Sequence, residues 1–310
     1  MFLTNLLFSC FYGIILKKSS GLEMDIKVTD VRCQKGDAAF LIDDGKTSIL
    51  YDTGFGFTGY AVAENIKRSL GERTLDYIFL THLHYDHALG SAYVLRHFPR
   101  AKVVAGTYAA DVFKRDGAKR VMKELDYKFA RTCGVTDYEF LGDELRVDIP
   151  VDNGDIVKAG DMEFEVISLP GHTRCCVAFY FAKEGLLRSN ETLGVYDGDT
   201  TILPACLVSF SNTISSIEKI EERKVMSIVA PHLGLLNKVQ TEFFLGNMKS
   251  AAQNIANNLL DSIKKGISDE EIIKQFKEKY WHGYIKEIYP EDAMTLNTSI
   301  MICLIKNELL

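Results

Sequence analysis

The chain has 310 residues, of which 47% are hydrophobic, and this is enough to bury a sizeable core in one large domain or two small ones. The net charge of −6 comes from interspersed acidic and basic residues without a long Lys/Arg run, which argues against nucleic acid as a partner. The seven cysteines are odd in number and lack Cys-x-x-Cys spacing, so we expect free thiols in a reducing, cytoplasmic compartment.

Residues 1–23 form an N-terminal extension with an apolar run from Asn5 to Leu16. This run is shorter than the ~20 residues of a membrane-spanning helix. No basic region precedes it and no small-residue cleavage site follows it, so membrane association is not expected. Two interpretations stay open: a mis-assigned start, with Met24 as the true one, or a weak signal or anchor segment.

After Met24 short apolar segments alternate with Gly/Asp turns, as in strands, and segments with 3.6-residue spacing lie between them. We predict strands at 26–33, 38–43, 47–54, 75–80, 101–106, 176–182 and 225–232, and hairpin strands within 153–173. We predict helices at 59–71, 87–98, from about 107 to 127, at 213–224, 241–266, 268–280 and 290–309. The sequence SDEE at 268–271 is typical of a helix start, with Ser268 as N-cap and acidic residues in the first turn.

This order of elements predicts an α/β domain at 24–236 and a helical C-terminal extension at 237–310. Too many hairpins occur for a purely parallel, doubly wound sheet. Two mixed sheets with helices outside them fit the pattern better.

The sequence FLTHLHYDHALG at 79–90 contains four side chains suited to metal binding directly after a predicted buried strand. His82 and His84 alternate with Leu83, so they can point the same way, and Asp86 and His87 follow at the turn into a helix. Imidazole and carboxylate groups together suit zinc, and also iron or manganese. One ion would not need all four groups, so the pattern suggests two adjacent ions. The alternative is a polar loop with incidental histidines.

Two more histidines occupy similar positions. His172 follows a predicted strand in a Pro-Gly turn, and His232 stands directly at a strand end. Sites in α/β proteins assemble at such strand ends, so we expect both to join the cluster. His97 and His282 lack this context, and we interpret them as surface or packing residues.

The motif HLHYDH, together with LYDTG before it and PGHT and APHLG after it, resembles the metallo-β-lactamase-fold hydrolases over residues 26–236. The resemblance implies a four-layer αββα sandwich with a dinuclear metal site at one edge. It assigns His82, His84 and His172 to the first metal and Asp86, His87 and His232 to the second. Asp52 matches the family's aspartate that orients a metal-binding side chain through a hydrogen bond.

Glu191 departs from the family pattern. In these hydrolases an aspartate in a context like S-G-D-T-L usually bridges both metals, and here the corresponding stretch is RSNETLG. Glutamate is one methylene longer, so Glu191 is expected to bridge the ions at a changed spacing or to bind only one of them. The alternative is that Glu191 is a surface residue and the second metal is weak.

Two adjacent cations would hold a hydroxide that attacks a small ester, thioester or lactone, and they would stabilise the oxyanion that forms. Asp86 is the candidate catalytic residue, orienting the nucleophile and carrying a proton. Tyr85 could line the pocket or pack beneath the metals, and Tyr196 and Asp197 could reach the substrate or simply close a loop. The adjacent cysteines at 175 and 176 are not expected to be ligands.

The helical extension also resembles that of glyoxalase-II-like and quorum-sensing thioesterases, whose helices follow the last histidine. However, DHALGS lacks the glycine pair usual in glyoxalase II, and no basic set for glutathione stands out. We therefore predict a hydrolase of small-molecule esters, thioesters or lactones with two divalent ions, zinc before iron or manganese. The alternative is a non-catalytic or redox ligand-binding or sensing protein on the same scaffold. The C-terminal helices could be a lid or a homodimer interface.

Overall fold

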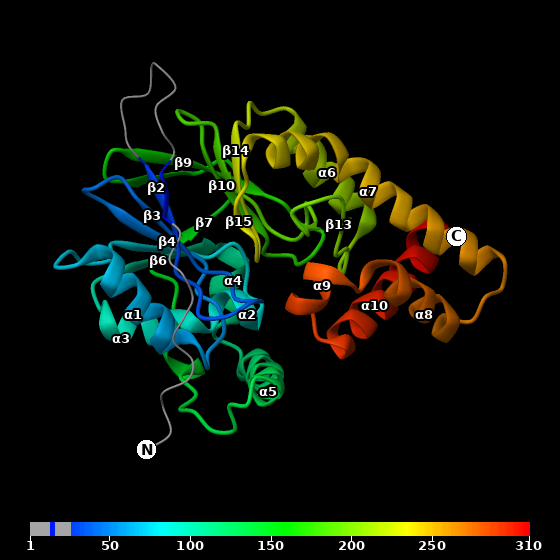
Figure 1. The fold of residues 1–310 in the computed structure, drawn as a ribbon, viewed down its shortest axis with the longest axis horizontal. Helices are drawn as coiled ribbons and strands as arrows, with labels where there is room; N and C mark the ends of the chain where they lie inside the picture. The colour runs from blue at the N-terminus through cyan, green and yellow to red at the C-terminus, as the bar shows by residue number, and fades with distance from the viewer. Residues whose placement is uncertain (1–12, 16–25) are drawn as a thin grey trace.

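The computed structural model describes residues 13–15 and 26–310, and within them two β-sheets face each other with helices on both outer sides (Figure 1). The first sheet has the spatial order β1 (Gly13–Ile15), β2 (Lys27–Asp30), β3 (Phe40–Asp43), β4 (Ser48–Tyr51), β5 (Tyr77–Phe79), β6 (Lys102–Gly106) and β7 (Ile149–Val151). The second has the order β15 (Gly234–Leu235), β14 (Ser227–Ala230), β11 (Leu186–Arg188), β10 (Val177–Phe181), β9 (Met162–Ser168) and β8 (Ile156–Ala159). A separate pair joins β12 (Val195–Tyr196) to β13 (Ile202–Leu203).

Both sheets are mixed, as the sequence predicted. In the first, β1 to β4 pair antiparallel and β4 to β7 pair parallel. In the second, β8 to β11 pair antiparallel, β11 pairs parallel with β14, and β14 pairs antiparallel with β15. Strand β1 belongs to the segment predicted as an N-terminal extension, and the rest of that segment lies outside the described residues.

The helices form the outer layers and the C-terminal extension. They are α1 (Gly59–Leu70), α2 (Tyr85–Ala88), α3 (Gly90–His97), α4 (Thr107–Val112), α5 (Asp116–Thr132), α6 (Phe210–Glu221), α7 (Lys238–Lys264), α8 (Asp269–Tyr280), α9 (Gly283–Ile288) and α10 (Glu291–Leu309), with a 3₁₀ turn at Gly142–Glu144. Helices α1 and α3 pack on the first sheet, and α6 and α7 pack on the second. The order helix, sheet, sheet, helix confirms the αββα prediction.

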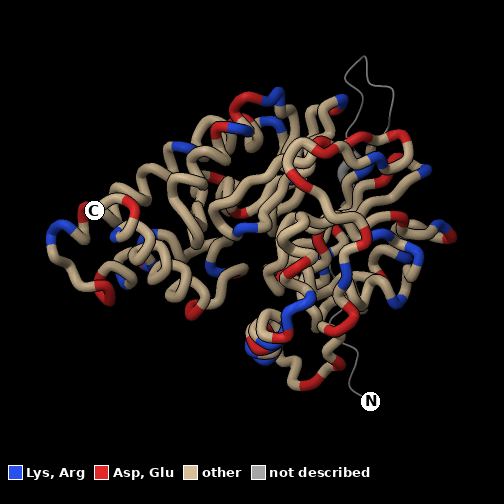
Figure 2. Tube along the Cα trace, turned by 180° about the vertical axis from the view of Figure 1, so that it is seen from behind, with Lys and Arg blue, Asp and Glu red and all other residues tan. Residues whose placement is uncertain are grey.

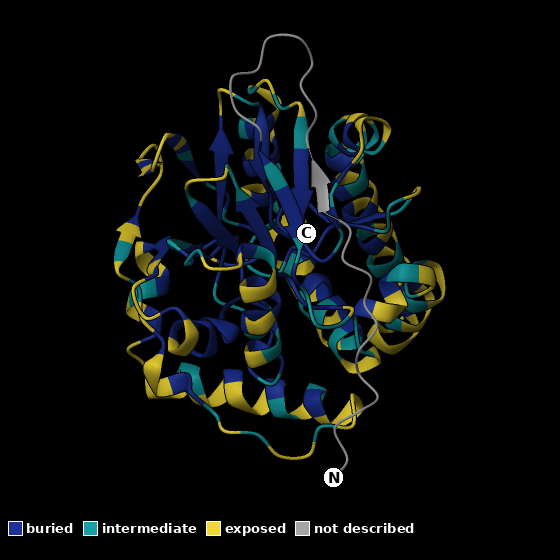
Figure 3. Cartoon of the chain, turned by 60° about the vertical axis from the view of Figure 1, so that its left-hand side comes forward, coloured by how far each residue is buried: buried dark blue, intermediate teal, exposed yellow. Residues whose placement is uncertain are grey.

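Strand β4 shows how the sequence builds these layers. Ile49 and Tyr51 point into the core between the sheets, whereas Leu50 points to the core under α1 and α3. Successive side chains on a strand face opposite sides, so a strand covered on both faces must be apolar at every position. Figure 3 shows the consequence: the central strands are buried, and the outer helices keep one exposed face.

The C-terminal helices form a further apolar cluster that packs against the pair β12–β13. Their ends follow the expected capping chemistry. The side chain of Ser268 accepts a hydrogen bond from the Glu271 amide, which confirms the predicted start of α8, and Asn237 and Gln240 form a capping box at α7.

The single helix predicted at 87–98 is divided into α2 and α3. The break coincides with a close backbone approach, because the Gly90 amide donates to the carbonyl of Gly54 at 3.1 Å. A Cβ atom at Gly90 would lie 2.1 Å from the carbonyl oxygen of Thr53. This contact comes from a distant loop, so helical periodicity could not report it.

Acidic and basic residues are interspersed over the described chain (Figure 2). In residues 13–15 and 26–310, no helix combines the length and the apolar character that crossing a membrane requires.

Candidate metal centre

The loop after β5 and the short helix α2 carry four of the predicted ligands. The amide of Thr81 donates to Asp52 Oδ1 at 2.7 Å, and this contact holds the chain where it leaves the sheet. His82 is fully buried, His84 is the N-cap of α2, and Asp86 and His87 lie within that helix. These side chains are therefore placed by a tight turn and not by strand alternation alone.

The other three predicted ligands come from the second sheet. His172 lies in the turn after β9, Glu191 follows β11, and His232 follows β14. All three are buried, with exposed fractions of 4%, 1% and 2%. The two sheets thus bring their strand ends together at one edge, which is where the sequence led us to expect the site.

The seven predicted side chains lie together in overlapping groups whose ligand atoms are within 4.8 Å of one another. The groups are His82/His84/His172, His82/His87/Glu191 and Asp86/His87/His232. The first and third groups coincide with the two ligand sets that the resemblance implied.

Glu191 lies between the two histidine sets. Its Oε1 is 2.7 Å from His87 Nε2 and 3.1 Å from His232 Nε2, whereas its Oε2 is 3.6 Å from His82 Nε2. Glu191 is buried, so the surface position in the alternative prediction is wrong. One carboxylate oxygen faces each side of the cluster, which is the arrangement a bridging group needs.

Several buried atoms of this cluster lack hydrogen-bond partners among the described residues. They are His82 Nε2 and both carboxylate oxygens of Glu191, whose close contacts do not have hydrogen-bond geometry. Leaving such atoms unpaired in the interior costs free energy, and a cation between them would remove that cost. Imidazole nitrogens and carboxylate oxygens suit zinc, iron and manganese, so the donor set fits divalent metal ions.

The histidines of the first group are neutral at neutral pH. Burial, together with the neighbouring His87, lowers the pKa of His84 to about 4. Burial and the adjacent His84 likewise lower the pKa of His172 to about 4. The two rings face each other with His84 Nδ1 and His172 Nε2 2.9 Å apart. Only neutral imidazole binds a metal, so burial prepares this pair for binding.

In the second group, attraction between His87 and the neighbouring carboxylates outweighs the effect of burial on the pKa values. Burial opposes the charge of His87, but Glu191, Asp86 and Asp52 outweigh it and raise the pKa of His87 well above its usual value. Burial would raise the pKa of Glu191, but the nearby His87 holds it well below its usual range. Glu191 is therefore a carboxylate, the form that binds cations.

Backbone carbonyls orient two of the rings. His172 Nδ1 donates to the carbonyl of Ala205 at 2.8 Å, and His232 Nδ1 donates to the carbonyl of Gly36 at 2.9 Å. A carbonyl can only accept, so Nδ1 carries the proton and Nε2 presents its lone pair to the cluster.

Asp52 orients His87, as the resemblance implied, and the structure adds a partner that sequence reasoning missed. Asp52 Oδ2 lies 3.1 Å from His87 Nδ1 and also accepts a hydrogen bond from Nη2 of Arg188, which is fully buried. Burial opposes ionisation of Asp52, but Arg188 and His87 lower its pKa below the usual value. An arginine inside the buried strand β11, three residues before Glu191, was the available signal.

A residue of the C-terminal extension helps to fix the backbone of His232. Its backbone has φ +59°, and within the described residues it and Asp52 are the non-glycine residues with positive φ. The carbonyl of His232 accepts hydrogen bonds from Nη1 of Arg32 and from the hydroxyl of Tyr284 on α9. Strained backbone of this kind persists where surrounding contacts over-determine it, and it clusters at functional sites. Sequence reasoning missed both Arg32 and Tyr284.

A cavity of about 380 Å³ opens onto the cluster. His84, Asp86, His87, His172 and Glu191 form one end of it. The opposite walls come from α5 and from residues 288–300, which include the start of α10. The end of α9 and the first half of α10 therefore line the same cavity as the metal-site residues.

Of the two tyrosines considered as substrate contacts, one lines the cavity and the other is part of the hydrophobic core. Tyr85 lines the cavity, and its ring packs on Phe55 with the centroids 5.6 Å apart. Tyr196 instead stacks on Phe243 in the core between the second sheet and α7, and its hydroxyl donates to the carbonyl of Asp199. Tyr196 is therefore a core residue and does not line the cavity.

Asp197 closes a turn by accepting hydrogen bonds from the amides of Asp199 and Thr201. The buried Cys175 and Cys176 contact the hydroxyl of Thr173 and belong to no metal-binding group among the described residues.

His97 and His282 lie outside the cluster, as expected. His97 Nε2 is 3.0 Å from a carboxylate oxygen of Glu64, and His282 is exposed with its Nε2 3.0 Å from the carbonyl of Lys279.

Comparisons with known proteins agree with this geometry. The sequence pattern of the Metallo-beta-lactamase superfamily matches residues 37–232. Two curated relatives are "Glyoxylase B2" of Dictyostelium discoideum, 28% identical over 156 residues (50% of this chain, 46% of that protein), and "Hydroxyacylglutathione hydrolase" of Gloeothece citriformis, 29% identical over 147 residues (46% and 44%). The chain spans about half the length of these curated relatives.

Solved structures show the same fold at low identity. A metallo-beta-lactamase family protein of Thermus thermophilus aligns with a TM-score of 0.56 and 19% identity over 93% of this chain and 91% of that one. An archaeal superfamily protein of Sulfolobus tokodaii aligns with a TM-score of 0.51 and 20% identity over 69% and 84%. The match over residues 37–232, on an αββα scaffold, shows that this chain belongs to the metallo-beta-lactamase superfamily.

Proposed function

We propose that this protein is a metal-dependent hydrolase that uses two divalent ions to cleave a small thioester, ester or lactone. The observation that carries the proposal is the position of Glu191, whose two buried carboxylate oxygens lack hydrogen bonds within the described residues and face opposite histidine sets beside a cavity. The name of the Gloeothece relative, a hydrolase of a glutathione thioester, supports thioesters as the first choice within this class.

The proposed ligands divide into two sets with one shared residue. His82, His84 and His172 would hold the first ion, Asp86, His87 and His232 the second, and Glu191 both. Zinc is our first choice, and iron and manganese suit the same nitrogen and oxygen donors.

Divalent ions bound here would acidify a water molecule and polarise the carbonyl group of the substrate. Asp86 faces the cavity with its Oδ2 3.6 Å from His87 Nε2 and 3.8 Å from His232 Nε2. Its carboxylate is placed to orient the attacking water, to accept a proton from it and to pass that proton to the leaving group. For a thioester, one water is consumed, the C–O bond forms, the C–S bond breaks, and a carboxylic acid and a thiol are released.

The outer contacts keep these groups in position. Asp52 orients the ring of His87, and the carbonyls of Ala205 and Gly36 set the tautomers of His172 and His232. Preorganisation of this kind avoids reorganising the site during the reaction.

The test combines metal content with turnover. Wild type, Glu191→Ala and the surface control His282→Gln would be loaded with zinc, desalted and examined by elemental analysis. Thiol release from acyl thioesters would be measured on the same samples. We expect two ions per chain and turnover in wild type and His282→Gln, and one ion or fewer with little turnover in Glu191→Ala. Wild type with bound metal but no turnover of any thioester, ester or lactone would instead favour the binding or sensing role.

A further inference from the structure

Apart from the metal-site residues, the walls of the 380 Å³ cavity are predominantly apolar. Apolar side chains of α5, of the end of α9 and of α10 line it together, namely Leu125, Phe129, Ile288, Ala293, Leu296 and Ile300. A concave apolar surface of this size is suited to desolvating one small hydrocarbon group.

The charge at the cavity is balanced. Outside the metal-site residues, the charged side chains that line it within the described chain are Lys128 on α5 and Asp292 on α10. They form an ion pair with each other at the rim, so together they contribute no net charge. A thiol that carries several carboxylates, such as glutathione, would meet no surplus of positive charge here.

Apolar surface is also exposed where the two helices meet. Leu125 on α5 is 38% exposed and Leu296 on α10 is 53% exposed, although both are large apolar side chains. Large apolar groups that stay in contact with water beside a concave site are typical of a binding surface.

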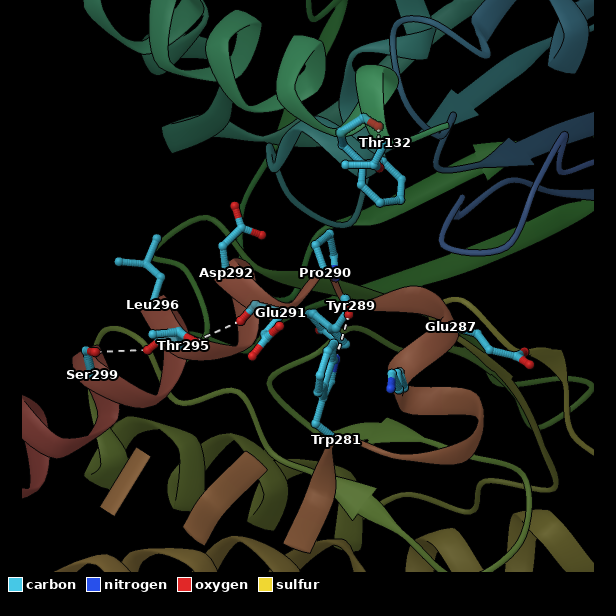
Figure 4. A pocket seen from close by; sticks show the side chains of 12 residues that line it. Thr132, Trp281, Glu287, Tyr289, Pro290, Glu291, Asp292, Thr295, Leu296 and Ser299 are labelled. Atoms are coloured by element: carbon cyan, nitrogen blue, oxygen red, sulfur yellow. Dashed lines mark hydrogen bonds between the residues drawn. The ribbon is translucent and has the colours of Figure 1, made fainter. Parts of the chain in front are cut away.

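An outer groove of about 890 Å³ adjoins this cavity (Figure 4). Phe129, Pro290 and Leu296 are among the residues that line both spaces. In Figure 4, Pro290 and Asp292 face Thr132 across the groove. These three residues continue the apolar lining of the cavity into the outer groove, which is also lined by the charged residues Lys286, Glu287, Glu291 and Asp292.

We propose that this cavity binds an unbranched aliphatic or aromatic acyl chain, so that the preferred substrates are thioesters of apolar carboxylic acids. The proposal rests on the hydrolase function above and specifies its substrate class. The acyl carbonyl lies at the end formed by Asp86 and Glu191, and the hydrocarbon chain lies between Phe129 and Leu296. Short, polar hydroxyacyl groups would make little apolar contact with this wall.

The first experiment measures kcat/KM for a series of straight-chain acyl thioesters, from acetyl to octanoyl, of one uncharged thiol, N-acetylcysteamine. Burial of each added methylene should raise kcat/KM by about fourfold until the cavity is filled. Lactoylglutathione serves as the polar, charged comparison, and we expect its kcat/KM to be at least tenfold below that of the hexanoyl thioester.

The second experiment measures binding without turnover. The probes are thioethers in which a methylene replaces the acyl carbonyl, titrated calorimetrically into the zinc-loaded protein. Affinity should rise with chain length in wild type. Ala293→Phe would fill the cavity, so it should abolish this dependence while leaving two zinc ions per chain. Val239→Phe, at a 74% exposed position on α7, adds a similar ring elsewhere and should behave as wild type.

Different results would refute the hydrolase function and the acyl-chain specificity. Chain-length-dependent thioether binding without turnover of any thioester, ester or lactone would refute the hydrolase function and confirm the apolar pocket. Thioether binding that does not change with chain length, or a kcat/KM that is highest for lactoylglutathione, would overturn the acyl-chain inference even if the protein is an active hydrolase. Equal behaviour of Ala293→Phe and wild type would also overturn it.

Discussion

Replacing Arg188 with methionine should destabilise the protein strongly, because it removes one partner of a buried ion pair. Arg188 and Asp52 both have 0% exposure, and Arg188 also donates from Nη1 to the carbonyl of Val229 at 3.0 Å. Breaking a buried pair on one side costs about 3–5 kcal/mol, since the remaining charge keeps its desolvation penalty. His87 stays beside Asp52 at 3.1 Å, so we expect the lower end, about 3 kcal/mol.

Equilibrium urea unfolding in the presence of a chelator measures this cost without the free energy of metal binding. Arg96→Met is the matched control, because Arg96 pairs with Glu139 and Glu144 at the surface and its loss should cost less than about 1 kcal/mol. Adding Asp52→Asn to Arg188→Met removes the orphaned charge and should recover part of the loss. A cost below about 1 kcal/mol for Arg188→Met, or strict additivity in the double variant, would refute the reasoning.

Burial raises the pKa of Asp126 to about 7. Between about pH 4 and 7 the folded protein therefore binds more protons than the unfolded chain. The free energy of unfolding falls as pH rises through this range. Urea titrations should show a loss of about 1.4 kcal/mol from pH 6 to 8 in wild type relative to Asp126→Asn, and parallel curves would contradict this. Tyr284→Phe removes a hydroxyl that donates to the His232 carbonyl, so chelator competition should show zinc affinity roughly tenfold weaker; unchanged affinity would show that the contact does not position His232. Gly90→Ala places Cβ 2.1 Å from the Thr53 carbonyl oxygen and should cost roughly 1–3 kcal/mol or prevent folding, whereas a melting temperature equal to wild type would disprove the close approach.

Much of the candidate site could be predicted from the sequence, because the proposed ligands are close together in the chain or directly follow strands. Six consecutive residues that follow β5 contain His82, His84, Asp86 and His87, so one turn is enough to bring them together. Strand segments such as 49–51 are apolar at every position because both of their faces are covered. This pattern can be recognised in the sequence.

The tertiary structure alone decided how distant segments support these ligands. Arg188 lies 136 positions from Asp52, and Tyr284 lies 52 positions from His232, so neither contact leaves a periodic trace in the sequence. The same holds for the cavity, which needs α5 and α10 to face each other. Periodicity reports that a helix has an apolar face, but which surface covers that face depends on packing between elements far apart in the chain.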